Sequence, residues 1–194
     1  MSLFETWGIG YDVALWPAER LGLRAMRQRL LDGVGGRVLE VGVGTGLNLP
    51  LYSADAPVVG IDPAWPMLVR AAQRQRLGQR LVQADVQALP FPDETFDWVV
   101  GTLVFCSVPD VVQGLTEVHR VLRPGGRVRL LEHVRGHTRL TRFLTDTLDP
   151  LWYGLNGACH LNRDPARLFP EAGLKVVRRE AHLGTLVEVI EAVR

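Results

Sequence analysis

The chain has 194 residues, of which 47% are hydrophobic, and this is enough for one globular domain with a sizeable core. Its formal net charge of +1 gives no global basic excess, so the composition argues against an electrostatic nucleic-acid binder. The two cysteines, Cys106 and Cys159, have no C-x-x-C spacing and predict neither a disulfide framework nor a zinc site.

Helical and strand patterns alternate along the first two thirds of the chain. Apolar residues at helical spacing predict a helix over about residues 12–32, and short runs rich in valine and leucine then predict buried strands. We expect strands at GGRVLEV (35–41), PVVGID (57–62), RLVQAD (80–85), FDWVVGTLV (96–104) and GGRVRLLEHV (125–134), with helices at 46–53, 64–77 and 110–122. This alternation predicts an α/β fold with a doubly wound, mainly parallel sheet that is covered on both faces.

The pattern changes after Val134. A mixed region rich in arginine, tryptophan and asparagine runs to about Pro170, and the last two runs predict an antiparallel pair of strands at the sheet edge. We therefore expect a single domain over residues 1–194, with an N-terminal helical cap at 1–35 and a second cap segment at 135–170. The N-terminal residues show no signal-peptide pattern, and no segment reaches 18 uncharged apolar residues, so we expect a soluble, cytoplasmic protein.

Doubly wound sheets bind ligands beyond the carboxyl ends of their strands, so the glycine-rich turn in LEVGVGTG is a candidate ligand site. Gly42 and Gly44 fit the dinucleotide fingerprint G-x-G-x-x-G, but Leu47 occupies the position of its third glycine and the extra glycine is Gly46. No Gly-Lys-Ser/Thr follows, so the turn is not a Walker motif either. Alone, the turn is also compatible with a strand–turn–helix joint that binds nothing.

Two further strand ends carry carboxylates. Asp62 stands twenty positions after Gly42, where it can accept hydrogen bonds from both ribose hydroxyls or cap the helix that starts near Ala64. Asp85 ends the third strand, where its carboxylate can accept from an adenine amino group while the backbone N–H of Val86 reaches a ring nitrogen. Together, the glycines, Asp62 and Asp85 at three strand ends predict a site for a ligand that contains adenosine, and they do not require that ligand to carry phosphates.

With these motifs the sequence resembles the class I S-adenosylmethionine (SAM)-dependent methyltransferases, over about residues 11–134. The segments LEVGVGTG, GIDP, ADVQALPFPDETFDWVVGTLV and VLRPGG are similar to successive motifs of the ubiquinone-methyltransferase-like branch. The resemblance implies SAM as the cofactor, no metal, and a Rossmann-like seven-stranded sheet, mostly parallel, with an antiparallel C-terminal edge strand. It also implies that the second cap segment lies on the acceptor side.

The resemblance assigns cofactor roles position by position. It implies that three glycines wrap the methionine moiety, that GIDP and the next two strand ends hold the nucleoside and the cofactor amino acid, and that an acidic residue braces the glycine loop. By position these are Gly42, Gly44 and Gly46 for methionine; Asp62 with Pro63 for the ribose; Asp85 and Val86 for adenine; Thr102 and Leu103 beside the cofactor amino acid; and Glu40 as the brace. Met67 matches a side chain that packs on the ribose or adenine, and it is equally compatible with a core residue of its helix.

Catalytic candidates lie outside these motifs. His133, which follows Glu132 at the end of the fifth strand, is a candidate for orienting the acceptor or accepting its proton, or else a histidine satisfied by a loop carbonyl. Tyr11 matches a tyrosine that folds over the cofactor in related methyltransferases. In the segment 151–164, the candidates for a pocket lid are Cys159, His160, Asn162 and Arg163. The alternative is local capping, in which Asn162 or Asp164 starts a helix near Pro165. We expect His119 and His182 at the surface or the sheet edge.

A narrower resemblance concerns the acceptor. TLVFCSVPD, LEHV, LDPLW and GACHLNRD are similar to segments of animal membrane-associated thiol methyltransferases and bacterial phospholipid N-methyltransferases, with Cys106 and Ser107 and the pair Asn162 and Arg163 in matching places. We expect no hydrophobic anchoring N-terminus like that of the animal members, so the resemblance does not carry a lipid acceptor over to this chain. Peripheral membrane contact through Trp7, Trp16 or Trp152 is compatible with the sequence but has no support in it.

Three functions are compatible with these motifs. The first is methylation of sulfur, nitrogen or oxygen in a small molecule, with phospholipid N-methylation as its variant. The second is methylation of nucleic acid or protein, against which the near-neutral charge argues; the sequence TLVF also stands where amino-methylating DNA enzymes have an Asn/Asp-Pro-Pro-aromatic tetrad. The third is a non-catalytic SAM-binding regulatory protein.

Overall fold

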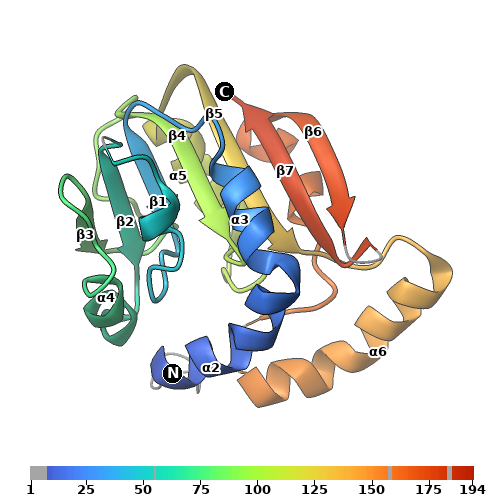
Figure 1. The fold of residues 1–194 in the computed structure, drawn as a ribbon. Coiled ribbons are helices and arrows are strands. Elements are labelled where there is room, and N and C mark those ends of the chain that lie inside the picture. Colours follow the sequence, from blue (N-terminus) through green and yellow to red (C-terminus); the bar gives the residue numbers. More distant parts are fainter. Residues whose placement is uncertain (1–7, 55, 157–158, 183–184) are drawn as a thin grey trace.

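A seven-stranded sheet forms the centre of the protein (Figure 1). The computed structural model describes residues 8–54, 56–156, 159–182 and 185–194. The strands lie in the order β3-β2-β1-β4-β5-β7-β6. Their bounds are Val38–Val41 for β1, Val58–Asp62 for β2, Arg80–Gln83 for β3, Phe96–Thr102 for β4, Leu122–His133 for β5, Lys175–His182 for β6 and Val187–Val193 for β7.

The predicted sheet is confirmed, including its parallel majority and its antiparallel C-terminal end. The strand that runs against its neighbours is β7, and it pairs with β5 on one side and β6 on the other. The C-terminal strand therefore lies one position inside the edge, and β6 with His182 forms the edge itself. The chain order reverses between β1 and β4, which pair in parallel, so the switch point lies at their carboxyl ends.

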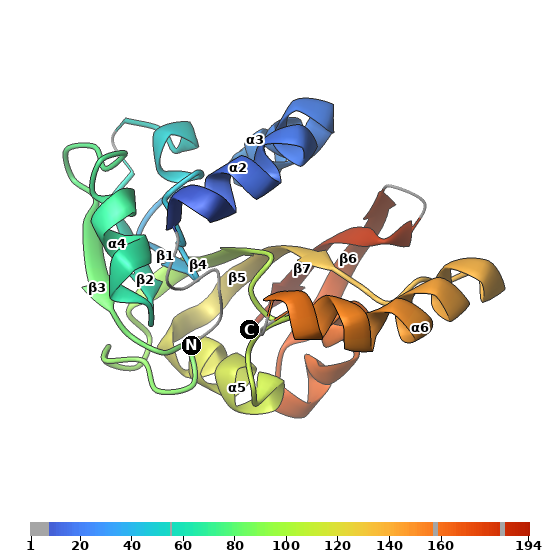
Figure 2. The same cartoon turned by 90° about the horizontal axis from the view of Figure 1, so that it is seen from below.

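Helices cover both faces of the sheet (Figure 2). The helices are α2 (Gly8–Ala18), α3 (Arg24–Leu31), α4 (Trp65–Ala71), α5 (Val111–Val121) and α6 (Arg139–Asn156). In Figure 2, α2 and α3 lie on one side of the sheet and α5 lies on the other. Two apolar clusters match these layers: one includes Leu30, Leu49 and Leu68, and the other includes Leu115 of α5 and Phe169.

Several helix predictions need correction. The segment 46–53 contains only a 3₁₀ turn, Leu49–Leu51, because Gly46 has a φ of 83° and Pro50 follows within the turn. The helix expected over 64–77 ends at Ala71, beyond which Leu77 is 97% exposed and no apolar face remains to bury. The helix expected over 12–32 is two helices, joined by a π-helical turn (Glu19–Leu23) that bends at Gly22, whose φ is 133°. The expected helix near Pro165 is two 3₁₀ turns, Pro165–Leu168 and Pro170–Ala172.

The cap segment at 135–170 contains α6, an 18-residue helix that both views show extending beyond the sheet (Figures 1 and 2). Its inward face is polar, since Thr145 and Asp149 are only 4% and 7% exposed. Its outward face is apolar, with Phe143 and Leu151 both more than 60% exposed. Across the described ranges, no helix combines the length and the apolar character that a membrane crossing requires.

Candidate functional site

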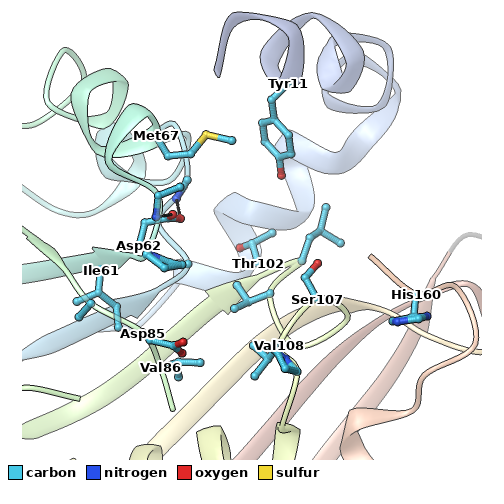
Figure 3. A pocket seen from close by; sticks show the side chains of 18 of the residues that line it. Tyr11, Ile61, Asp62, Met67, Asp85, Val86, Thr102, Ser107, Val108 and His160 are labelled. Carbon is cyan, nitrogen blue, oxygen red and sulfur yellow. Dashed lines mark hydrogen bonds between the residues drawn. The ribbon is translucent and has the colours of Figure 1, made fainter. Parts of the chain in front are cut away.

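A cavity of 610 Å³ opens at the carboxyl ends of the parallel strands (Figure 3). This volume falls within the range of about 300–1,000 Å³ that is typical of small-molecule sites. Residues from the ends of β1, β2 and β4 line it, together with the segment after β3, helices α2 and α6, and the loop after α6. Of the residues predicted from the sequence, it is lined by Tyr11, Gly42, Gly44, Asp62, Pro63, Met67, Asp85, Val86, Thr102 and Leu103.

The glycine loop after β1 needs its glycines for two different reasons. Gly42 and Gly44 line the cavity with φ angles of 59° and 54°, which side chains disfavour. An added Cβ on Gly42 would lie 2.5 Å from Val104 Cγ2, whereas one on Gly44 would meet no atom closer than 3.9 Å and would enter the open space. Gly46 does not line the cavity; an added Cβ there would lie 2.9 Å from the Cα of Ala71 in α4, so this glycine permits close packing.

Asp62 joins the glycine loop to the start of the next segment. Its Oδ2 accepts the backbone N–H of Gly44 at 2.9 Å and its Oδ1 accepts that of Ala64 at 2.9 Å. The helix-cap interpretation of Asp62 is not confirmed: the N-cap of α4 is Ala64, and the bond from Ala64 to Asp62 closes a turn just before the helix. Asp62 is 8% exposed and lines the cavity, so its carboxylate is also available to a bound ligand.

Asp85 lies in a tight local turn at the opposite end of the same wall. Its Oδ1 accepts the backbone N–H of Gln87 at 2.9 Å, and the amide of Gln87 donates to both carboxylate oxygens at 3.1 and 3.0 Å. Gln87 also accepts the backbone N–H of Asp110, the N-cap of α5, at 2.8 Å. Sequence reasoning missed Gln87, although its position two residues after an aspartate is a signal for an Asx turn.

Glu40 is hydrogen-bonded to Asn48, in the segment that follows the glycine loop. Asn48 Nδ2 donates to Oε1 of Glu40 and to Oγ1 of Thr102, both at 3.0 Å, and its Oδ1 accepts from Arg27 Nη1 at 3.0 Å. Glu40 is 2% exposed and does not line the cavity. Burial raises the pKa of Glu40 to about 7, against the opposing effects of the Asn48 hydrogen bond and the charge of Arg27.

Glu132 holds the loop after β4 by accepting hydrogen bonds from its backbone N–H groups. Its Oε1 accepts the backbone N–H groups of Val104 and Phe105, each at 3.0 Å, and Oε2 lies 3.4 Å from that of Cys106. Burial raises the pKa of Glu132 to about 7, although these hydrogen bonds lower it. The loop that it holds presents Val104, Ser107 and Val108 to the cavity. Glu132 itself is fully buried behind that wall.

His133 does not line the cavity, contrary to the expectation that it faces the crevice together with Glu132. Successive side chains of a strand point to opposite faces, so a Glu132 that holds the loop after β4 turns His133 away from it. Burial lowers the pKa of His133, and its Nδ1 is buried with no hydrogen-bond partner in the part of the chain that the structure describes.

Tyr11 lines the cavity from α2 (Figure 3). Burial raises the pKa of Tyr11 to about 12, so its hydroxyl stays protonated at neutral pH. The next residue, Asp12, fixes the helix: it accepts from Thr45 Oγ1 in the glycine loop at 2.6 Å and from Arg74 Nη2 at 2.8 Å. This tether had no sequence signal, because its three members are distant along the chain.

The loop after α6 closes the remaining side. His160 and Arg163 line the cavity together with Tyr153 of α6, while Cys159 and Asn162 do not line it. Arg163 donates to the carbonyl oxygens of Phe105 and Val108 and so fastens this loop to the loop after β4. Both cysteines are free thiols, and the contact with Cys159 together with burial raises the pKa of Cys106.

The other residues raised by the sequence lie away from the cavity. Trp16 and Trp152 are 58% and 42% exposed, and Trp7 lies outside the described residues. His119 is half-buried on α5. No group of three or more His, Cys, Asp or Glu side chains suitable for a metal ion occurs within the described ranges.

Comparisons with known proteins agree with this site. A family model described as a methyltransferase domain matches residues 39–130. A phosphatidylethanolamine N-methyltransferase of Cereibacter sphaeroides is 48% identical over 104 residues, which is 51% of this chain and 51% of that protein. A thiol S-methyltransferase of Homo sapiens is 34% identical over 148 residues, which is 73% of this chain and 61% of that protein. The chain thus spans about half to three fifths of the length of these relatives.

A solved SAM-dependent methyltransferase of Thermotoga maritima, described as a possible histamine N-methyltransferase, has the same fold. It superposes with a TM-score of 0.76 at 22% identity, and the match covers 98% of this chain and 97% of that one. The matched family model includes the glycine loop and the strand ends that carry Asp62 and Asp85. The chain belongs to the class I S-adenosylmethionine-dependent methyltransferases.

Proposed function

We propose that the protein transfers the methyl group of SAM to a nucleophilic sulfur, nitrogen or oxygen atom of a small molecule. The observation that carries the proposal is the composition of the cavity. Its strand-end wall combines an open glycine loop with Asp62 and Asp85, which suits an adenosyl group. Its other end is lined by hydroxyls, an imidazole and aromatic rings from Tyr11, Ser107, Tyr153 and His160, which leaves room for a second molecule.

The residues present fit a phosphate-free adenosyl cofactor. Gly44 leaves open space where any side chain would intrude. Of the described residues that line the cavity, Arg163 alone carries a permanent positive charge, and two backbone carbonyls already engage its guanidinium. The described part of the cavity wall thus offers no uncommitted cation to a pyrophosphate, and an adenosyl group without phosphates does not require one.

The proposed roles follow the family pattern where the geometry supports it. The backbone at Gly42 and Gly44 lies beside the methionine moiety, and Asp62 accepts hydrogen bonds from the ribose hydroxyls. The segment at Asp85 and Val86 binds the adenine. Thr102, Leu103, Pro63 and Met67 complete the surface around the cofactor. Gly46 and Glu40 act indirectly, since the first packs the loop on α4 and the second holds it through Asn48.

Methyl transfer from SAM requires the protein mainly to orient the acceptor. Bound SAM supplies a methyl carbon that its sulfonium already activates. The protein must then hold the acceptor in line with that carbon, and orientation of this kind is worth up to about 7–11 kcal/mol in favourable model systems. Tyr11 is suited to orienting the acceptor, because a phenol with a pKa of about 12 remains a neutral hydrogen-bonding group.

The rim of the cavity favours an acceptor with an apolar body. Tyr153 lines the cavity from α6, and its neighbours along the helix, Trp152 and Leu155, are 42% and 62% exposed. An apolar acceptor would bury part of this surface as it enters. The names of the relatives state a phospholipid and a thiol as methyl acceptors of those proteins. The acceptor panel below therefore includes amines and thiols.

Calorimetric titration with SAM and with NAD tests the cofactor, and we expect SAM to bind and NAD not to bind. Tight NAD binding without SAM binding would refute the proposal that SAM is the cofactor. Accumulation of S-adenosylhomocysteine with a panel of thiols, amines and phenols then tests transfer. SAM binding without product from any acceptor would favour the non-catalytic alternative, and a salt-sensitive affinity for oligonucleotides would reopen the nucleic-acid alternative.

A further inference from the structure

A histidine and a carboxylate form a hydrogen-bonded pair at one end of the cavity. Nδ1 of His160 lies 3.2 Å from Oδ2 of Asp149, and His160 lines the cavity. Figure 3 shows His160 on the opposite side of the cavity from Asp62 and Asp85. The pair therefore belongs to the half of the cavity that the proposed function leaves for the methyl acceptor.

The carboxylate of Asp149 is fixed at both of its oxygens. Oδ1 accepts the backbone N–H of Leu161 at 2.6 Å, and Oδ2 faces the imidazole. Asp149 is only 7% exposed, so water competes little for these contacts. A carboxylate at Nδ1 selects the tautomer that carries its proton on Nδ1, and Nε2 of His160 then keeps its lone pair.

The imidazole ring is held in place from two further directions. The ring of Tyr153 stacks on it, with centroids 4.5 Å apart and an interplanar angle of 14°. The backbone N–H of His160 donates to the carbonyl oxygen of Cys106 at 3.0 Å, which ties the histidine to the loop after β4. Within the described part of the chain, Nε2 has no hydrogen-bond partner, so a bound molecule can take that place.

We infer that His160 is the general base of this site and that Asp149 positions it. Nε2 of His160 accepts the proton of the attacking atom as the X–H bond breaks, and the freed electron pair forms the bond from X to the methyl carbon. The bond from that carbon to sulfur breaks with its electrons passing to sulfur, which becomes a neutral thioether. Asp149 stabilises the imidazolium until its proton leaves to water.

This inference rests on the proposed function and narrows its acceptor. A tertiary amine carries no proton on its reacting atom and needs no base. A thiol or a phenol does carry one, with a pKa at or above neutrality, and the free cysteine thiol has a value of about 8.5. The geometry therefore points to an acceptor with an ionisable X–H group, set in an apolar body.

The test compares two thiols of different acidity as acceptors for wild type and for His160→Gln. An alkyl thiol is protonated at neutral pH, whereas an aryl thiol with electron-withdrawing groups is already ionised. We expect kcat/KM of His160→Gln to fall about 100-fold or more with the alkyl thiol, and much less with the ionised aryl thiol. The Kd for SAM, measured by calorimetry, should be unchanged, and His160→Ala provides a second variant if the glutamine misfolds.

Two further measurements separate base chemistry from structural support. Nitrogen NMR of histidine in the full chain should show Nδ1 of His160 protonated and Nε2 unprotonated, with the preference reduced in Asp149→Asn. His137→Gln is a matched control: His137 Nε2 pairs with Glu188 Oε1 at 3.1 Å, is 41% exposed, and does not line the cavity. This control should keep the activity of wild type with both thiols.

The outcomes distinguish this inference from the proposed function. Equal losses with both thiols, or a proton on Nε2 in place of Nδ1, would overturn the role of His160 as a base. A wild-type protein that binds SAM but methylates only acceptors without an X–H proton would overturn it as well, while leaving the cofactor proposal in place. Failure to bind SAM would instead refute the proposed function.

Discussion

Replacing Asp62 by alanine separates a structural role, in the glycine loop and the turn before α4, from a ribose-binding role. In the protein alone, the change removes two acceptor contacts to backbone N–H groups, those of Gly44 and Ala64, both at 2.9 Å. Hydrogen bonds to a charged group contribute about 1.5–3 kcal/mol each, so the free energy of unfolding should fall by about 3–6 kcal/mol at most. If Asp62 also accepts from the ribose, SAM should bind about 1.5–3 kcal/mol more weakly, which is roughly 10- to 150-fold in Kd.

Calorimetry with S-adenosylhomocysteine and denaturant unfolding measure the two effects separately. Asp62→Asn keeps the size of the side chain and one acceptor oxygen, and we expect it to lie between wild type and alanine in both. Asp110→Ala is the matched control, because Asp110 caps α5 by accepting the backbone N–H of Gln113 at 3.0 Å and does not line the cavity. It should lower stability by about 1 kcal/mol without changing Kd.

A thermodynamic cycle excludes an indirect effect through the glycine loop. Removal of both ribose hydroxyls, as in a 2′,3′-dideoxy analogue of S-adenosylhomocysteine, should weaken binding to wild type and have little further effect on Asp62→Ala. Equal losses in the two proteins would show that the carboxylate does not contact the ribose. Asp62 would then only hold the glycine loop and the turn before α4, and the predicted ribose contact would be wrong.

Two other perturbations follow from the same contacts. Gly44→Val places a side chain in the open part of the cavity and should abolish measurable SAM binding, whereas Gly46→Val meets Ala71 at 2.9 Å and should mainly lower the melting temperature. Burial raises the pKa of Glu40 and Glu132 from 4.5 to about 7, so the unfolded state loses these protons first and the free energy of unfolding should fall as pH rises from about 4.5 to about 7. The loss in the free energy of unfolding is about 3 kcal/mol per group over this pH range. In Glu132→Gln, the part of this pH dependence that is due to Glu132 should disappear from unfolding curves measured between pH 4.5 and 8. An equally steep pH dependence in this variant would show that the pKa of Glu132 is not raised.

The sheet could be predicted because parallel strands buried on both faces are continuous apolar runs. Val38–Val41, for example, is buried at every position. Helices were less predictable where a short apolar pattern had no face to bury or met a glycine and a proline, as at Gly46 and Pro50. The sequence gives the composition of such a segment, but the tertiary contacts decide whether a helix forms.

The residues that line the strand-end wall of the cavity were also predictable, since they sit at fixed offsets from strand ends. The acceptor half was not, because its residues come together only through tertiary contacts between segments that are distant along the chain. Strand alternation alone could have shown that Glu132 and His133 cannot both face the cavity. The spacing of Thr145 and Asp149, four residues apart on α6, was a signal for a buried polar face, and with it for the partner of His160.

The two halves of the cavity are therefore formed by different parts of the chain. Strand ends and buried carboxylates hold the cofactor half, and the family model that matches residues 39–130 includes this half and neither α2 nor α6. Polar contacts attach α2 and the loop after α6 to this half, such as Asp12 with Thr45 and the backbone N–H of His160 with the carbonyl oxygen of Cys106. Caps held in this way can differ in sequence without disturbing the sheet. The similarity to other methyltransferases thus informs mainly on the methyl donor, and the acceptor has to be inferred from the side chains that the caps contribute.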